Sequence, residues 1–474
     1  LPMSTDDLCF TPATELAPLI RSKQLSPVEL CEAVLARVER LEPTLNAFVA
    51  LTADRAMETA RGVEGQIMRG EVVGPLAGIP MTIKDLAVTA EVPTQRGSLS
   101  LKGNVHDTDT PFVTRLKQAG AVMLGKTTTS EFGWKGVSHS PLTGITHNPW
   151  KHGMNAGASS AGAGVAAAAG YGPLHHGSDG AGSIRMPSHF CGVFGIKPSF
   201  GRVPAWPASN TDQVSHNGPM TRTVADSAMM LKVMSGPHPW DHYSLESPPD
   251  DYVGRLRRGI KGWRVAYSPD LGHARVDPEV ASLVAAGVKA FEEMGCQVEQ
   301  VSNADLAFAQ DGPELIRFFW AVHETAGYAH LLPEWESQLD PGLVACIKAG
   351  EGYSAVEYMK MRARKLAYME GWHRFMEKYD ILITPAVSVA AFPADRLNPE
   401  HWPQHEWDWV QWAEFSYPFN FSNQPAASVP CGFTEAGLPV GLQIVGPRFD
   451  DLGVLQAAAA FEEARPWADK RPPV

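Results

Sequence analysis

The sequence has few charged residues for its length, and it lacks the features that mark disorder. Only 19% of its 474 residues are charged, against roughly 25% in ordinary soluble domains. A low charged fraction indicates a large interior relative to the surface. We therefore expect one large domain or two tightly fused ones over residues 1–474, rather than several small modules, and the composition excludes a disordered chain.

Positive charge and long apolar runs are also scarce. The chain carries 40 Lys and Arg against 52 Asp and Glu, a net charge of −12. Without a dense basic stripe, we expect no nucleic-acid partner. Without 18 consecutive apolar residues, we expect no membrane partner. The first residues lack a signal-peptide pattern, so we predict a cytoplasmic protein. A monomer and a homodimer both stay open.

Several catalytic patterns are absent. The six cysteines are scattered, with no C-x-x-C, and no H-E-x-x-H occurs. We therefore predict neither a metal nor another cofactor, and free thiols. The adjacent His175 and His176 lack the spacing of helical metal ligands and are interpreted as loop histidines. Neither G-x-S-x-G nor S-x-x-K is present, which disfavours α/β-hydrolase and β-lactamase-like chemistry.

Two nucleotide-binding patterns are better explained by packing. Residues 120–127 (GAVMLGKT) fit the P-loop formula, but their apolar middle indicates a strand rather than a phosphate-wrapping loop. Residues 162–167 (GAGVAA) fit the looser dinucleotide pattern without a preceding apolar strand, and Asp179 follows in a glycine-rich loop. We interpret them as a helix that packs closely through small residues. A nucleotide-binding protein remains an alternative of another class.

Strands and helices alternate along the chain. We predict N-terminal helices within residues 4–70, with Ser26 capping the helix at 26–41. The remaining predicted helices are 53–68, 111–118, 223–234, 355–378, 452–464 and one from residue 277. The predicted strands are 79–83, 121–124, 193–196, 297–301, 381–384 and 438–445. This alternation favours an α/β fold whose central β-sheet has helices on both faces.

Glycine and serine gather in one segment. Between Gly153 and Gly201, 12 of 49 residues are glycine, in loops such as 155–162 (NAGASSAG) and 178–185 (SDGAGSIR). Consecutive small residues can turn several backbone N–H groups toward one point, forming an oxyanion hole beside a serine. Taken alone, Ser159 or Ser160 also fits the cap of a helix.

These two loops resemble the motifs of the amidase signature family of serine hydrolases. Further matches, in order, are residues 78–85 (GIPMTIKD), 148–150 (NPW), 192–198 (GVFGIKP), 423–426 (NQPA) and 441–446 (GLQIVG). The resemblance runs nearly end to end and is nearest to bacterial aryl-acylamidase and urethanase-type members. It implies the amidase signature fold, with a mixed central sheet and a signature core over residues 74–235.

The resemblance also implies a Ser–Ser–Lys triad. Ser183 would be the nucleophile, Ser159 the bridging serine after a cis peptide bond, and Lys84 the base. A lysine acts as a base only when it is neutral, and burial in an apolar strand lowers its pKa.

The remaining site residues are implied in the same way. The oxyanion donors would be the backbone N–H groups of Gly180, Ala181, Gly182 and Ser183, while Ser160, Asp179 and Arg185 would support the loops. Ala158, Ala161 and Ala181 stand where the family usually has glycine. Alanine tolerates positive φ poorly, so these three positions should have ordinary backbone angles or be strained.

The substrate is less well defined by the sequence. We expect residues 304–419 to form a variable substrate pocket. Four of the 13 tryptophans lie within residues 402–412, a loop that either covers the substrate or is anchored in the core by its tryptophans. We predict hydrolysis of C–N bonds in small amides, including anilides, and in aryl carbamates (urethanes). A glutaminase resembling the A-subunit of a tRNA-dependent amidotransferase is the alternative.

Overall fold

Strands supply the frame of the molecule. The computed structural model describes residues 4–209, 212–248 and 251–474. The strands are β1 (Phe48–Leu51), β2 (Pro80–Lys84), β3 (Val122–Thr127), β4 (His139–Ser140), β5 (Gly144–Ile145), β6 (Leu174–Asp179), β7 (Phe194–Lys197), β8 (His216–Thr221), β9 (Arg264–Tyr267), β10 (Gln297–Gln300), β11 (Ile381–Pro385), β12 (Ala426–Phe433) and β13 (Pro439–Val445). All except β4 and β5 form one 11-stranded sheet, in the order β1-β3-β2-β6-β8-β7-β12-β13-β11-β9-β10.

The sheet is mixed, as the family resemblance implied. Strand β2 runs parallel to both β3 and β6, and β9 runs parallel to both β10 and β11. Between these two parallel groups, β6, β8, β7, β12 and β13 pair in antiparallel fashion. The predicted α/β class with a mixed central sheet is confirmed.

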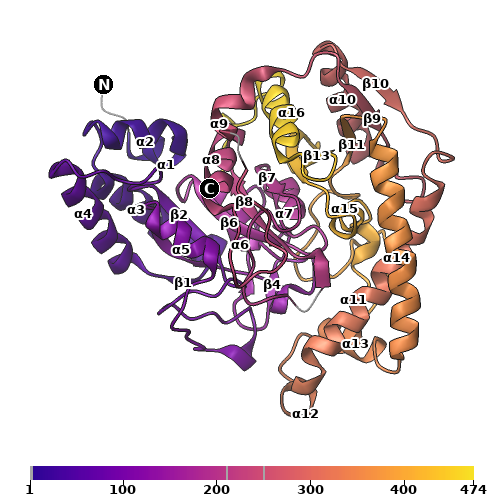
Figure 1. The fold of residues 1–474 in the computed structure, drawn as a ribbon. Helices are drawn as coiled ribbons and strands as arrows, with labels where there is room; N and C mark the ends of the chain where they lie inside the picture. The colour runs from indigo at the N-terminus through magenta and orange to yellow at the C-terminus, as the bar shows by residue number, and fades with distance from the viewer. Residues whose placement is uncertain (1–3, 210–211, 249–250) are drawn as a thin grey trace.

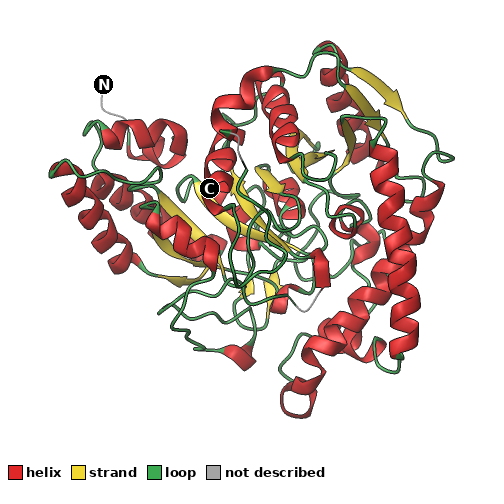
Figure 2. Cartoon of the chain, viewed as in Figure 1, coloured by secondary structure: helices red, strands yellow, loops and turns green. Residues whose placement is uncertain are grey.

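Helices surround this sheet (Figures 1 and 2). They are α1 (Thr5–Phe10), α2 (Ala13–Arg21), α3 (Pro27–Leu45), α4 (Ala53–Met68), α5 (Pro111–Gln118), α6 (Ala161–Ala169), α7 (Arg185–Cys191), α8 (Val224–Met234), α9 (Tyr252–Arg255), α10 (Pro278–Glu293), α11 (Gly312–Tyr328), α12 (Leu332–Trp335), α13 (Pro341–Ala349), α14 (Ala355–Met376), α15 (Tyr417–Phe421) and α16 (Asp451–Ala464). In Figure 1, α1–α4 lie at one end of the molecule and α11–α14 at the other. Among the described helices, none is long and apolar enough to cross a membrane.

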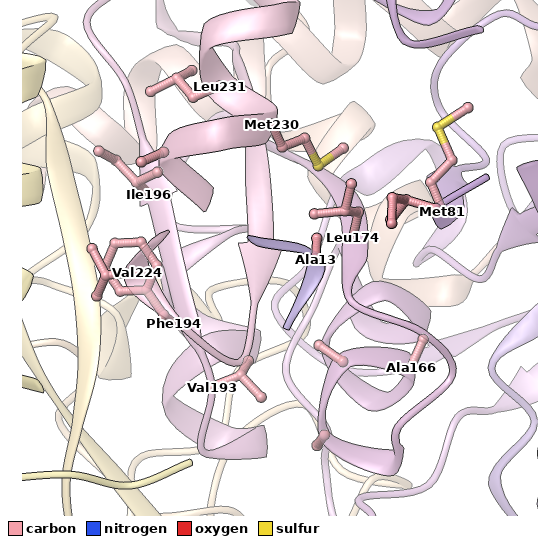
Figure 3. Packing of buried hydrophobic residues seen from close by; sticks show 14 of the residues in the cluster. Ala13, Met81, Ala166, Leu174, Val193, Phe194, Ile196, Val224, Met230 and Leu231 are labelled. Atoms are coloured by element: carbon pink, nitrogen blue, oxygen red, sulfur yellow. The ribbon is translucent and has the colours of Figure 1, made fainter. Parts of the chain in front are cut away.

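Successive residues of the central strands enter two different hydrophobic cores. In β11, Ile381 and Ile383 belong to one buried cluster and Leu382 belongs to the other. Neighbouring residues of a strand point to opposite faces, so each face of the sheet is covered. Figure 3 shows part of the first cluster, where Met81 and Leu174 pack near α8. The predicted covering of both faces is therefore confirmed.

Local sequence signals located most helices correctly. The predictions for 53–68 and 111–118 coincide with α4 and α5. The hydroxyl of Ser26 accepts the N–H groups of Val28 and Glu29, as a helix cap should, and α3 then continues to Leu45 rather than ending at residue 41. Strand β6 was missed, although it carries part of the site, and so were β1, β4, β5, β8, β9 and β12.

Candidate active site

A cavity of about 290 Å³ opens where β6 leaves the sheet. Its wall includes Ser159, Ser178, Gly180 and Ser183, which come from the loop before α6, from β6 and from the loop between β6 and α7. Ser159 is only 2% exposed and Ser183 only 5%. The two serines singled out in the sequence thus line the same cavity.

Lys84 lies beneath this cavity at the end of β2, with none of its surface exposed. Its Nζ atom lies 2.7 Å from Ser159 Oγ and 2.9 Å from Ser178 Oγ, and it donates to the backbone oxygen of Ser178 at 3.3 Å. The parallel pairing of β2 with β6 brings Lys84 and Ser178 together, although 94 residues separate them.

Burial lowers the pKa of the Lys84 ammonium well below its usual range, although the Asp179 carboxylate opposes this shift. The three oxygen partners suit a neutral amine, which has two protons to donate and one lone pair to accept a proton. Burial and these contacts are the features that a lysine base would need.

Ser159 and Ser160 stand at the turn into α6. The peptide bond between Ala158 and Ser159 is cis, as the family resemblance implied. Ser160 occupies the N-cap position, but its hydroxyl makes no cap bond. Instead, its hydroxyl donates to the backbone oxygen of Ser178 and accepts the N–H of the same residue. Ser160 therefore holds the α6 loop against β6.

Asp179 and Arg185 organise the loop that contains Ser183. The Asp179 carboxylate accepts N–H bonds from Gly182 at 2.7 Å and Ile184 at 3.1 Å, and Arg185 donates to both carboxylate oxygens at 3.0 and 2.8 Å. Burial alone would raise the pKa of the Asp179 carboxyl, but the Arg185 guanidinium holds it well below its usual range. This fully buried ion pair fixes the loop around Ser183.

The prediction that the N–H of Gly182 is an oxyanion donor must be corrected. The N–H of Gly182 is already donated to Asp179, so it does not point free into the cavity. In the described part of the chain, the N–H groups of Gly180, Ala181 and Ser183 have no backbone or side-chain acceptor. Of these three residues, Gly180 and Ser183 line the cavity.

The three alanines that replace family glycines have ordinary backbone angles. Ala158, Ala161 and Ala181 are all absent from the non-glycine residues with positive φ. Gly182, by contrast, has φ +113°, and a Cβ atom there would lie 2.4 Å from Ser416 Oγ. The loop therefore needs glycine at position 182 and tolerates alanine at 181.

The residues of both nucleotide-binding patterns are packed inside the fold. Lys126 of the P-loop-like segment is buried in β3, where its Nζ atom bonds the Ala87 carbonyl at 2.9 Å and pairs with Asp85 at 3.2 Å. Gly162 lies in α6, where a Cβ atom would meet the Ala47 carbonyl at 2.2 Å. The strand and the close helix packing are both confirmed, and the P-loop alternative is wrong.

The interpretation of His175 and His176 as loop residues is also wrong, because both lie in β6. His175 bonds Thr82 Oγ1 at 2.9 Å and His176 bonds Asn217 Oδ1 at 3.1 Å. Burial lowers the pKa of His175 to about 4, so it is neutral at pH 7. Asp179 likewise ends β6 instead of lying in a loop. Within the described residues, no group of His, Cys, Asp and Glu could hold a metal ion, and all six cysteines are free.

The tryptophan-rich segment belongs to the core. Trp402, Trp409 and Trp412 are buried in the second hydrophobic cluster, and Trp409 Nε1 donates to the Trp134 carbonyl at 2.8 Å. None of the tryptophans at 402–412 lines the cavity. Of the two alternatives for residues 402–412, the structure therefore favours the core anchor over the substrate cover.

Ser178 and Glu324 are polar residues of the cavity wall to which the sequence assigned no role. Ser178 contacts Lys84, and its place directly before Asp179 in the quoted motif was the available signal. Glu324 of α11 also lines the cavity and lies in the variable region, but no local pattern distinguished it from other helical glutamates.

Comparison with known proteins identifies the class. A sequence model of the Amidase family matches residues 29–455. The chain therefore belongs to the amidase signature family and is an amidase, a hydrolase that acts on carbon–nitrogen bonds.

Its relatives include an acylamidase and a component of a tRNA-dependent enzyme. The acylamidase, from Rhodococcus erythropolis, is 39% identical over 480 residues, which cover 99% of this chain and 98% of that protein. The A-subunit of a glutamyl-tRNA(Gln) amidotransferase from Moorella thermoacetica is 34% identical over 493 residues, covering 98% and 99%. Among solved structures, a bacterial aryl acylamidase of the amidase signature family is similar with a TM-score of 0.89, 29% identity and 97% coverage of each chain.

Proposed function

We propose that this amidase forms an acyl-enzyme on Ser183, with Ser159 as the proton bridge and Lys84 as the base. The observation that carries the proposal is the buried contact of 2.7 Å between Lys84 Nζ and Ser159 Oγ, beside a cavity that Ser183 also lines. A serine hydroxyl is a weak nucleophile and needs such an activated base.

The proton transfers follow from this arrangement. Neutral Lys84 takes the hydroxyl proton of Ser159, Ser159 takes the proton of Ser183, and Ser183 Oγ attacks the substrate carbonyl carbon. The lysine proton then returns through Ser159 to the departing nitrogen when the C–N bond breaks. Water attacks the resulting ester by the same route and releases the acid and free Ser183.

Backbone groups stabilise the tetrahedral intermediate. The N–H groups of Gly180, Ala181 and Ser183 surround the position of the developing oxyanion, and each well-aimed donor contributes about 3 kcal/mol to the transition state. Gly182 has the different task of donating to Asp179, which holds the loop in place.

The substrates proposed are small amides, with anilides and aryl carbamates among them. Aromatic side chains support this range, because Phe132, Trp320 and Tyr328 line the cavity. An aryl leaving group stacks favourably on such rings. We also propose a single amidase domain over residues 1–474, with part of its pocket supplied by residues 304–419.

A glutaminase acting within a complex is the second candidate. The identity of 34% to the A-subunit of an amidotransferase, over nearly the whole chain, favours it. It predicts that the isolated chain hydrolyses glutamine and spares anilides, whereas the first proposal predicts anilide and carbamate turnover without any partner.

Initial rates on a 4-nitroanilide, an aryl carbamate and glutamine test both candidates. We expect anilide or carbamate turnover, and a loss of about 1,000-fold or more in kcat in both Ser183→Ala and Lys84→Met, because members of a triad act as a unit. Ser302→Ala, at an exposed serine, is the matched control and keeps the wild-type rate. More than about a hundredth of the wild-type rate in Ser183→Ala would overturn the assignment, and turnover of glutamine alone would favour the second candidate.

A further inference from the structure

One face of helix α11 forms part of the cavity wall. Trp320, Glu324, Gly327 and Tyr328 all line the cavity that contains Ser159 and Ser183. Their spacing of four, three and one residues places them on the same side of a helix. Glu324 is thus an acidic residue within an otherwise apolar or aromatic face that looks into the substrate space.

The Glu324 carboxyl is buried with one oxygen unpartnered. Its side chain is 2% exposed, and Oε2 has no hydrogen bond within the described residues. Burial alone raises the pKa of this carboxyl to about 8. A buried polar group without a hydrogen bond destabilises a fold. A role in binding therefore explains this buried carboxyl better than a role in stability.

The neighbours of Glu324 in the wall suit a cation. The rings of Phe132 and Tyr328 stack at 4.2 Å, and Trp320 adds a third aromatic side chain to the same cavity. Aromatic faces and a carboxylate are the combination that recognises ammonium groups. Arg96 also lines the cavity, and no salt bridge joins it to Glu324 among the described residues.

We propose that Glu324, with Phe132, Trp320 and Tyr328, forms a subsite for a protonated primary amine carried by the substrate. The preferred substrates are then amides with an alkylammonium group a few bonds from the scissile carbonyl. An arriving ammonium favours the ionised carboxyl, and the displaced proton leaves to solvent. The inference deepens the function proposed above and rests on it, because Ser183 supplies the chemistry.

Two isosteric substrates test the subsite. 5-Aminopentanoyl 4-nitroanilide carries the ammonium group, and hexanoyl 4-nitroanilide has a methyl group in its place. We expect the wild type to prefer the amine substrate by about tenfold or more in kcat/KM, the value of one charge-assisted hydrogen bond. Glu324→Gln should remove that preference through KM, while its kcat/KM on the hexanoyl substrate stays within about threefold.

A binding measurement separates this inference from the proposed reaction. Calorimetry of n-pentylammonium with Ser183→Ala should show binding that is weakened about tenfold or more by adding Glu324→Gln. Glu314→Gln, at an exposed acid of the same helix, is the matched control and leaves both readouts unchanged. If the protein binds the ammonium but does not hydrolyse the anilide, only the proposed reaction at Ser183 is overturned. Equal effects of Glu324→Gln on both substrates, or ammonium binding that ignores Glu324, would overturn the subsite.

Discussion

Individual buried polar residues separate into two kinds in this molecule. Asp179 is fully buried but satisfied by Arg185 and by backbone N–H groups, and it orders the loop around Ser183. Lys84 is equally buried and has three oxygen partners, and burial lowers the pKa of its ammonium group well below the usual range. Glu324 is buried and lacks a partner at Oε2. Asp179 orders the loop, whereas Lys84 and Glu324 have the shifted pKa values that the proposed chemistry and the proposed subsite require.

The titration of Glu324 predicts a pH-dependent stability difference. Its pKa is about 8 in the folded chain, against a usual 4.5. Between these pH values the folded state therefore holds a proton that the unfolded state has released, so rising pH destabilises the fold. Glutamine does not titrate. The free energy of unfolding of Glu324→Gln should thus exceed that of the wild type by a margin that grows from pH 5 to pH 8, by at most about 1.4 kcal/mol per pH unit.

Urea unfolding of both proteins at pH 5, 6.5 and 8 measures this margin. The exposed Glu314→Gln serves as the control, with a difference from wild type that stays small across the series. A margin for Glu324→Gln that is constant with pH would show that the carboxyl titrates normally, and that it is not buried as described.

At the scale of elements, the loop between β6 and α7 depends on one glycine. Gly182→Ala should destabilise the loop by about 1–3 kcal/mol, because φ is +113° and the new Cβ would meet Ser416 Oγ. It should also reduce kcat by displacing Ser183. Gly180→Ala, two residues away, has open space around its Cβ position and an ordinary φ, so its melting temperature should match the wild type.

Thermal unfolding and anilide kinetics of the two variants provide the comparison. Equal melting temperatures for both would contradict the strain at position 182. Equal losses of kcat would instead mean that any side chain at this loop obstructs the substrate, since Gly180 lines the cavity itself.

The sequence predicted elements where the signals were local. Helix α4 has periodic apolar positions, and α3 begins at the capping hydroxyl of Ser26. Strand β6 reads LHHGSD and has neither alternation nor β-branched residues. Its histidines form hydrogen bonds with Thr82 and Asn217, which lie on neighbouring strands. Partners so far away in the sequence cannot be predicted from a local pattern.

The sequence predicted only those parts of the candidate site that local motifs mark. Lys84, Ser159 and Ser183 came from motifs, and the structure gathers them around one cavity. The engagement of Gly182 with Asp179 could not be foreseen, because it depends on where one N–H points after the loop has folded. Glu324 was missed because its meaning lies in burial and in the absence of a partner at Oε2, which are properties of the tertiary structure.

At the scale of the whole molecule, two cores flank one sheet and the second core carries the pocket wall. Trp320 of α11 packs edge-on against Trp409, with ring centroids 5.6 Å apart, and both Nε1 atoms donate to the Trp134 carbonyl. The 402–412 segment thus braces the helix that lines the cavity, without touching the substrate space itself.

This bracing predicts a loss of stability from Trp409→Ala. Removing a fully buried tryptophan leaves a cavity and should cost about 3–5 kcal/mol in the free energy of unfolding. Trp407→Ala, in the same segment but only partly buried, should cost much less. Denaturant unfolding of the two variants measures the difference. Similar stabilities would contradict the assignment of this segment to the core.

The central claim, that Ser183 is the acylated residue, is tested most directly by locating the acyl group. Wild-type protein mixed with 4-nitrophenyl acetate and quenched in acid can be digested and its peptides analysed by mass spectrometry. We predict one acetyl group on Ser183, none in Ser183→Ala, and slower acetylation in Lys84→Met because the base is missing. An acetyl group on Ser159 or Ser178 in the wild type, with Ser183 unmodified, would contradict the account.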